Sequence, residues 1–429
     1  MKALRIGLLG CGTVGGGVVQ LLHENASYLA TRAGAPLEIA KVLVRDTDRA
    51  RVQQLDRSLL TRNPEEVLGD PSIDVMVETM GGVDPTRSFV ERALSRGQSV
   101  VTANKMLLAL HGPALLELAA KHGADLAFEG SVGGGIPIVR TLREALASDW
   151  VVSLRGIVNG TCNYILSRMR EDGESFEGAL REAQAKGYAE AEPSLDVDGH
   201  DAAHKLVVLA MLAFGARVDS GSVPTEGIRR IEPVDHRFAA RFGFAIKHLA
   251  LGRDLGHAIE LCVRPSLVRD DSVLANVGGV LNAIALEGRA LGPCLLSGRG
   301  AGDLPTAVSV VADIVDVARA RVQGTQGLDT RAIQLAARPL SPLAESRCRH
   351  YLRFPVRDVP GVLARIAGAL GDCGVSIEQM VQEGQGHEAS VQIVLLTHVA
   401  REQDVDAALA RLHGADFAAA PALRLHVVE

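Results

Sequence analysis

The segment ALRIGLLGCGTVGGGV at residues 3–18 decides the fold of this chain. Its apolar run 3–9 predicts a short strand, and the residues from about Val14 to Tyr28 have the periodicity of a helix. A second apolar run, EIAKVLV at 38–44, completes a β-α-β unit. The glycines between strand and helix therefore stand where a doubly wound α/β fold makes its first tight turn.

These glycines form a G-x-G-x-x-G pattern that runs from Gly10 through Gly12 to Gly15. In this context the pattern indicates a dinucleotide site. The first glycine allows the turn, the second lets backbone approach a pyrophosphate, and the helix N-terminus attracts negative charge. We expect cofactor contacts from this turn and from Thr13 and Val14. The alternative is an ordinary glycine turn without a ligand.

The residue after the second strand bears on the choice of nucleotide. Folds that select NAD usually place a carboxylate there for the ribose hydroxyls. Here Val44 is followed by Arg45, which favours the 2′-phosphate of NADP. The neighbouring Asp46 keeps NAD open as an alternative.

Composition sets the class of the protein. A chain of 429 residues is long enough for two or three domains, and 47% hydrophobic residues with only 3% aromatics suit the Ala, Val, Leu and Ile cores of parallel sheets. The net charge of −6 with dispersed basic residues argues against nucleic acid. Six separated cysteines without a C-x-x-C pair suit a reducing compartment, so we expect a cytoplasmic protein. The longest apolar run, 206–214, is too short to cross a membrane.

Changes in pattern divide the chain into an expected order of domains. A Rossmann-type nucleotide-binding domain is followed by an α+β domain for substrate and dimerisation, a linker, and a ferredoxin-like β-α-β-β-α-β module with a turn at 384–388. A periodic helix at about 304–322 is expected to pack back on the first domain. The expected boundaries are 1–140, 141–323, 324–348 and 349–429.

Two lysines stand out because the chain has only seven among 45 basic residues. Lys105 follows the strand-like run 99–103, at the sheet edge where open α/β folds bind ligands. Lys205 lies one helical turn after Asp201. In isolation this pair is an ordinary helix salt bridge.

An acidic stretch just before this pair changes its interpretation. The run 187–200 contains Glu190, Glu192, Asp196 and Asp198, carboxylates that could hold a substrate ammonium group. A rival reading takes the segment from His200 to His204 as a zinc-binding H-E-x-x-H motif with Asp for Glu, which predicts a metallohydrolase. That reading lacks a third ligand and leaves the glycine turn without a role.

A glycine-rich loop follows a further strand at residues 129–137. Such a loop can turn several carbonyl oxygens toward a hard cation. The alternative is a flexible turn into the next domain, although Pro137 limits the backbone flexibility of such a turn. The sequence leaves both open.

The motifs together resemble a known family. Six segments, in order, resemble homoserine dehydrogenase across residues 1 to about 320: GLLGCGTVGGGV, VTANKMLLA, FEGSVGGGIPIV, GIVNGTCNYIL, GYAEAEPSLDVDGHDAAHKL and GRGAGDLPTAVSVVADI. The C-terminal VRDVPGVLARIAGALGDCGVSIEQMVQ is similar to ACT domains, which bind amino acids as regulators. Two positions depart from the usual family pattern, Glu192 for Asp and Asp303 for Gly.

The resemblance implies a reaction and roles for residues. It implies reversible reduction of L-aspartate 4-semialdehyde to L-homoserine by NAD(P)H, on the route to threonine and methionine. Lys205 would exchange the proton with the substrate oxygen, and Lys105 would lie beside nicotinamide and substrate. Glu190 and Asp201 would hold the substrate ammonium group. Further implied contacts are Thr13, Val14, Gly187 and Gly302 for the cofactor, and Glu129, Val132, Gly134 and Ile136 for a structural cation, sodium.

The resemblance also carries expectations about regulation and assembly. The turn Asp358-Val-Pro360-Gly361 resembles the place where ACT domains seat an amino-acid effector, for which threonine is the natural candidate. The alternative is an ACT module used only for association. A homodimer or tetramer is expected. Two other functions stay open: a dehydrogenase of another amino-acid-derived aldehyde or hydroxy acid, and a ligand-sensing protein with an inactive Rossmann domain.

Overall fold

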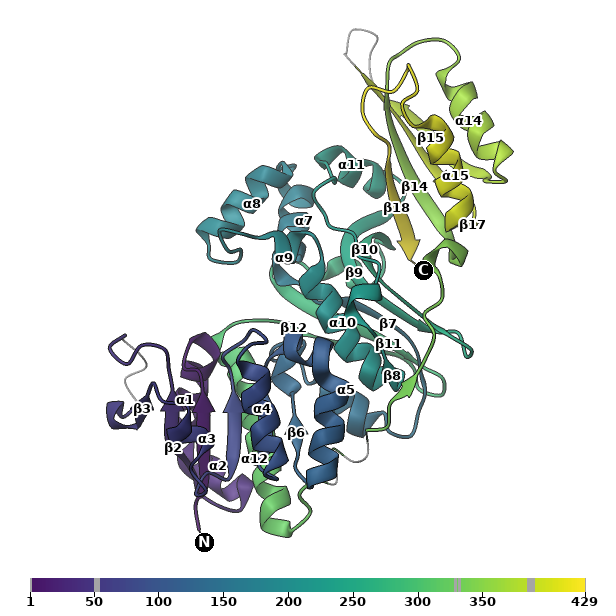
Figure 1. The fold of residues 1–429 in the computed structure, drawn as a ribbon. Helices are drawn as coiled ribbons and strands as arrows, with labels where there is room; N and C mark the ends of the chain where they lie inside the picture. The colour runs from purple at the N-terminus through teal and green to yellow at the C-terminus, as the bar shows by residue number, and fades with distance from the viewer. Residues whose placement is uncertain (1, 50–54, 328–329, 331–332, 384–389, 429) are drawn as a thin grey trace. The chain divides into compact units, whose positions relative to one another are not determined.

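The computed structural model describes residues 2–49, 55–327, 330, 333–383 and 390–428 (Figure 1). The chain forms two compact units. The first consists of residues 1–154, 203–223 and 282–338, and the second of 155–202, 224–281 and 339–429. The turn expected at 384–388 lies outside the described residues. In the part of the chain that is described, no helix combines the length and apolar character needed to span a bilayer.

A 6-stranded sheet organises the first unit. Its order is β3-β2-β1-β4-β5-β6 and its pairings are parallel. This is the strand order of the dinucleotide-binding doubly wound fold, so the predicted fold class is confirmed. The strands are β1 (Leu4–Leu9), β2 (Leu37–Leu43), β3 (Leu60–Thr61), β4 (Val75–Glu78), β5 (Ser99–Thr102) and β6 (Leu126–Ala127).

Helices cover this sheet. The segment predicted as one helix from Val14 is two, α1 (Thr13–Glu24) and α2 (Ala26–Ala33), because the backbone of Asn25, with φ −110° and ψ 19°, departs from helical geometry. The other helices are α3 (Glu65–Leu68), α4 (Thr86–Ser95) and α5 (Lys105–His122).

A helix from much later in the sequence, α12 (Asp303–Gln323), also packs on this sheet. Its buried Val310 and Ile314 share one apolar cluster with Ile6 of β1 and Val18 of α1. Gly17 permits this approach, since a Cβ there would lie 2.9 Å from the Cβ of Ala307.

The remaining elements of the first unit include three at which the chain passes from one unit to the other. The chain leaves the first unit within β7, returns within α10 and returns again within β11. The short strands β8 and β13 pair in parallel. These elements are α6 (Ile138–Arg140), β7 (Val151–Ile157), α10 (His200–Ala213), β8 (Ala216–Arg217), β11 (Leu281–Gly288), β12 (Gly292–Arg299) and β13 (Ala336–Ala337).

The second unit begins with helices and a long antiparallel hairpin. Strands β9 (Phe244–Asp254) and β10 (Ile259–Arg269) pair along their whole length. Helices α7 and α11 contribute Ile165 and Phe238 to the apolar cluster beside β9. The helices are α7 (Gly160–Asp172), α8 (Phe176–Ala185), α9 (Ser194–Val197) and α11 (Pro233–Arg241).

The C-terminal fold has the predicted β-α-β-β-α-β order. Its sheet continues into the hairpin, because β18 pairs in parallel with β10 and the strand order is β9-β10-β18-β14-β16-β15. One face of this sheet packs on α14 and α15, and the other contributes Tyr351 and Leu425 to the cluster beside β9. The elements are β14 (Arg347–Val356), α14 (Val362–Asp372), β15 (Ile377–Glu383), β16 (Val391–Thr397), β17 (Ala400–Arg401), α15 (Glu402–Leu412) and β18 (Leu423–Val428).

Candidate active site

The glycine turn has the geometry of a nucleotide site. Gly10 has φ +92°, and a Cβ there would lie 3.0 Å from the backbone of Met80. A Cβ at Gly15 would lie 2.4 Å from the Gly10 carbonyl oxygen, whereas one at Gly12 would meet nothing within 4 Å. Gly12 and Thr13 are exposed, Val14 is half-buried, and no side chain caps α1. The helix end therefore presents backbone N–H groups toward open space, as a pyrophosphate requires.

Arg45 lies two residues beyond β2 and is exposed. A carboxylate oxygen of Asp46 accepts the backbone N–H of Asp48 at 2.8 Å. Part of the Asp46 carboxylate is thus used by the local turn, and Arg45 follows the carboxyl end of β2.

Lys105 is the first residue of α5, and a buried network fixes the start of that helix. The Asn104 side chain accepts the N–H of Leu107 at 3.0 Å and donates to the Gly82 carbonyl at 2.6 Å. The backbone N–H of Asn104 donates to the hydroxyl of Thr102 at 3.0 Å, and this hydroxyl donates to Glu78 at 2.5 Å. Lys105 is half-buried and directly follows Asn104 in the sequence.

The carboxylate of Glu78 completes this network at the end of β4. It also accepts the N–H groups of Met80 at 2.8 Å and Gly81 at 3.1 Å. Burial raises the pKa of Glu78, because water no longer stabilises its charge. The network joins the ends of β4 and β5, and so fixes the backbone from which Lys105 projects.

Lys205 lies on α10 and is only 8% exposed. Helix α10 packs on α5, since a Cβ at Gly112 would lie 3.4 Å from the Met211 sulfur. An ion pair joins Glu117, further along α5, to Arg217, just beyond α10. Residue numbers thus rise together in both segments, from the Gly112–Met211 contact to the Glu117–Arg217 ion pair.

The acidic stretch before α10 is organised by Asn159. The Asn159 Nδ2 donates to Asp196 at 2.7 Å and to Asp201 at 2.9 Å. Its side-chain oxygen accepts the N–H of Cys162 at 2.8 Å and caps α7. Asp201 is 4% exposed and lies in the first turn of α10, one turn before Lys205. One amide thus holds two carboxylates at the start of the helix that carries the lysine.

The other predicted contacts lie at turns. Glu190 is exposed, and its backbone carbonyl accepts the Gln184 side chain at 3.0 Å. Gly187 has φ +74° after α8, and Gly302 has φ +118° at the start of α12. The Asp303 carboxylate accepts the N–H of Leu304 at 2.7 Å.

The glycine-rich loop has a buried carboxylate at its base. Glu129 is 3% exposed, and its two oxygens accept the N–H groups of Val139 at 2.9 Å and Arg140 at 2.8 Å. Burial raises its pKa. The Glu129 N–H donates to Asp313 at 2.8 Å. The carboxylate therefore holds the loop against α6 through hydrogen bonds within the chain.

The loop carbonyls are also partly engaged. The Gly134 carbonyl accepts the Ser309 hydroxyl at 2.7 Å, and the Ile136 carbonyl accepts the N–H of Ile138 at 2.7 Å. Val132 is buried beside them in sequence. Each carbonyl oxygen keeps a second lone pair, so this set fits a cation that prefers oxygen ligands.

Comparison with known proteins identifies the family. Family models for the homoserine dehydrogenase domain, its NAD-binding domain and the ACT domain match residues 137–315, 10–129 and 350–417. A homoserine dehydrogenase of Pseudomonas aeruginosa is 40% identical over 100% of this chain and 99% of its own length. The chain belongs to the homoserine dehydrogenase family. A Bacillus subtilis homoserine dehydrogenase is 40% identical over 96% of this chain and 95% of its own length.

Solved homoserine dehydrogenases share the fold. A structure from Thiobacillus denitrificans superposes with a TM-score of 0.94 at 42% identity, covering 100% of this chain and 99% of that one. One from Staphylococcus aureus has a TM-score of 0.78 at 30% identity, covering 100% of both chains. A hyperthermophilic archaeal member in complex with NADPH has a TM-score of 0.62 at 26% identity, covering 73% of this chain and 97% of that one.

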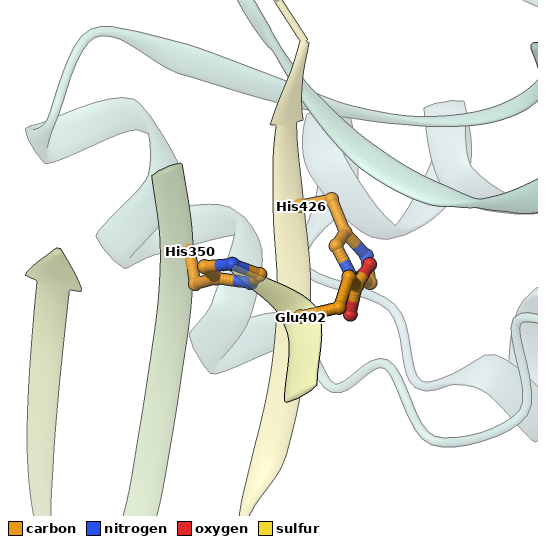
Figure 2. A group of neighbouring side chains, drawn as sticks. All are labelled: His350, Glu402 and His426. Carbon is orange, nitrogen blue, oxygen red and sulfur yellow. The ribbon is translucent and has the colours of Figure 1, made fainter. Parts of the chain in front are cut away.

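Family membership removes the metallohydrolase alternative. Among described residues, the group of three side chains spaced to hold a metal ion is His350, Glu402 and His426, not the His200–His204 motif. Figure 2 shows His426 and Glu402 turned toward each other, with His350 on the adjacent strand. All three are buried.

Charge argues against a metal at this group too. The Glu402 carboxylate lies 2.6 Å from His426 Nε2 and forms ion pairs with Arg264 and, at 3.0 Å, with Arg424. Burial alone would raise the pKa of Glu402, but the hydrogen bond from His426 and the two guanidiniums hold it at about 2. Burial lowers the pKa of His426 to about 3, so its ring is neutral. Two adjacent guanidiniums would repel a cation, and the group instead joins α15 to β10.

Asn159 and Glu78 are the positioning residues that sequence reasoning does not find. Asn159 lies inside the quoted segment GIVNGTCNYIL, but its two carboxylate partners are 37 and 42 residues away in sequence. Glu78 carried a weak signal, a carboxylate at the end of the apolar run VMVE. Its partner Thr102 lies on the neighbouring strand.

Proposed function

We propose that this chain reduces L-aspartate 4-semialdehyde to L-homoserine reversibly, with Lys205 as the proton-transferring group. The observation that carries the proposal is the start of α10. Asp201, held by Asn159, and the 8% exposed Lys205 lie one turn apart on the same helix. A carboxylate for the substrate ammonium and an ammonium for the substrate oxygen thus have a fixed spacing.

The packing of α10 on α5 supports a shared role for the two lysines. Lys205 precedes Met211 by six residues and Lys105 precedes Gly112 by seven, which is about 9 Å and about 10 Å along a helix. Because residue numbers rise together from the Gly112–Met211 contact to the Glu117–Arg217 ion pair, we infer that both lysines lie toward the same end of the two helices. That end is where α5 follows the carboxyl edge of the sheet.

The chemistry then divides among the residues. The nicotinamide supplies a hydride to the aldehyde carbon when it is bound. Lys205 donates a proton to the oxygen that becomes the homoserine hydroxyl, and takes it back in oxidation. Lys105 stabilises negative charge that develops on this oxygen. Glu190 and Asp201 bind the substrate ammonium group.

The cofactor and cation contacts extend the proposal. Gly10, Gly12, Thr13, Val14 and Gly15 bind the pyrophosphate, and Arg45 gives a preference for NADP. Gly187 and Gly302 line the nucleotide. Sodium binds the loop through Glu129, Val132, Gly134 and Ile136, and removal of sodium is expected to lower the midpoint of thermal unfolding.

The proposal also covers regulation and assembly, for which the C-terminal fold provides the support. An amino acid, with threonine as first candidate, regulates the enzyme through the ACT domain, and the chain works as a homodimer or tetramer. Gly361 has φ +89° at the start of α14, and no side chain caps that helix. These features support the turn at 358–361 as one place for an effector.

The experiment is an initial-rate assay with L-aspartate 4-semialdehyde, comparing NADPH with NADH. Lys205→Met should lower kcat by about 10²–10⁴-fold, the usual contribution of a positioned proton donor, while urea unfolding stays within experimental scatter. Lys121→Met, in the last turn of α5, is the matched lysine control and should keep full activity. A wild-type chain that consumes neither nucleotide, or an active Lys205→Met, would refute the proposal.

A further inference from the structure

A pocket of about 460 Å³ lies in the second unit, between the segment 226–231 and the C-terminal elements α15 and β18. Its lining contains charges of both signs beside apolar groups such as Pro265 and Leu409. The charged residues are Asp198, Glu226, Arg229, Arg230, Asp406 and Arg424. A lining of this kind suits a small ligand that carries both charges.

Ion pairs within the lining leave two groups with capacity for a ligand. Arg229 is paired with Asp198 at 2.5 Å, and Arg424 with Asp406 at 2.5 Å. Among the described residues, the ion pair of the Glu226 carboxylate is a long one, 3.9 Å to Arg424. Arg230 donates through one terminal nitrogen to the Ala422 carbonyl. A guanidinium has five N–H donors, so Arg230 is held in place and still has donors for a carboxylate.

We propose that this pocket binds a free α-amino acid, separately from the turn at 358–361. Arg230 binds the α-carboxylate, and Glu226 binds the α-ammonium group. A short aliphatic or hydroxylated side chain lies against Pro265 and Leu409. The pocket joins the C-terminal fold to the segment that precedes α11, so it forms only in the full chain.

The floor of the pocket touches the acidic stretch of the proposed active site. Gly227 allows this contact, since a Cβ there would lie 2.4 Å from the Val197 carbonyl oxygen. The Ile228 N–H donates to the same oxygen at 2.9 Å. The preceding residue, Asp196, shares the Asn159 amide with Asp201. A ligand that shifts segment 226–230 therefore shifts Asp196 and, through Asn159, Asp201.

This contact predicts coupling between the pocket and the substrate, a step that rests on the proposed function. An amino acid bound in the pocket should change KM for the semialdehyde more than KM for NADPH. Coupling is reciprocal, so saturation with homoserine and NADP should change the Kd of the amino acid by the same factor.

Binding is tested first, because it does not depend on activity. Thermal unfolding of the full chain with each of the proteinogenic L-amino acids selects the most stabilising one, and titration calorimetry gives its Kd. The N-acetyl derivative and the α-amide of that amino acid serve as ligand controls and should bind at least about tenfold more weakly.

Variants locate the site. Glu226→Gln and Arg230→Gln should each weaken binding at least about tenfold, which corresponds to about 1.4 kcal/mol. Arg237→Gln, whose side chain is 68% exposed on α11, is the control and should leave Kd unchanged, whereas Asp358→Asn tests the ACT turn as the alternative site for the same amino acid. Urea unfolding of every variant checks that it folds.

The outcomes are distinct. Loss of binding in the two pocket variants alone supports the proposal. No binding of any amino acid at millimolar concentration, unchanged binding in folded Glu226→Gln and Arg230→Gln, or loss only in Asp358→Asn would overturn it. Binding without any change in KM would overturn the coupling step alone, and an inactive enzyme that still binds would count against the proposed function and not against the pocket.

Discussion

Replacing Asn159 separates two functions that one side chain combines. Its oxygen caps α7 through the N–H of Cys162, and its nitrogen holds Asp196 and Asp201. Asn159→Ala removes both functions. Asn159→Asp keeps the capping oxygen but replaces the donor with a third negative charge beside two carboxylates.

The expected magnitudes follow from these contacts. Loss of the cap should cost Asn159→Ala about 1 kcal/mol of unfolding free energy. A hydrogen bond to a charged group contributes about 1.5–3 kcal/mol, so release of Asp201 should raise KM for the semialdehyde by about 10- to 100-fold in both variants. KM for NADPH should stay the same, because this contact does not involve the glycine turn.

The assay is initial-rate kinetics over a range of semialdehyde concentrations, with urea unfolding of each variant. Comparing Asn159→Ala with Asn159→Asp distinguishes an effect on the position of Asp201 from an effect on folding, because Asn159→Asp keeps the α7 cap. A KM for Asn159→Asp within about twofold of wild type, a change equivalent to under 0.5 kcal/mol, would show that the Asn159 amide does not position Asp201 for substrate.

Three further predictions concern the nucleotide turn, nucleotide choice and acid stability. Gly15→Ala should lose NADPH binding, measured by fluorescence titration, because its Cβ would lie 2.4 Å from the Gly10 oxygen, whereas Gly371→Ala, with nothing within 4 Å, should bind normally. Arg45→Ala should raise KM for NADPH about tenfold and leave KM for NADH nearly unchanged, and equal effects on both would contradict a role in reading the 2′-phosphate. Burial lowers the pKa of His236 from 6.5 to about 4. As the pH falls below about 6.5, His236 therefore takes up a proton in the unfolded chain before it does so in the folded chain, and the free energy of unfolding decreases. Between pH 7.5 and 5 this loss is about 2 kcal/mol by urea unfolding, and His236→Phe should lack that part of the pH dependence.

Local patterns in the sequence were enough for the parallel sheet and its first turn. The apolar run before Gly10 and the glycine spacing up to Gly15 depend on neighbours in sequence, and the structure has the strand, turn and helix in that order. The periodic spacing of apolar residues likewise predicted a helix near 304–322, and the structure has α12 there, packed on α1.

Contacts between distant segments could not be read in the same way. The hydrogen bonds of Asn159 depend on how the acidic stretch folds back, and the sequence gives no register for that contact. The expected role of Glu129 is another example. The family resemblance implies that Glu129 binds a cation, whereas the structure shows its carboxylate accepting the N–H groups of Val139 and Arg140, contacts that depend on tertiary packing.

The parallel pairing of β18 with β10 limits how this protein can be dissected. Ser266 and His426 are partners across that junction, and the buried ion pair between Arg264 and Glu402 lies beside it. Cutting the chain before β14 would leave the backbone N–H and C=O groups of β10 that face β18 without partners and would open an apolar face to water. A truncated version would measure the damage of the cut together with the loss of the ACT domain, so the role of that domain is best studied by single substitutions in the intact chain.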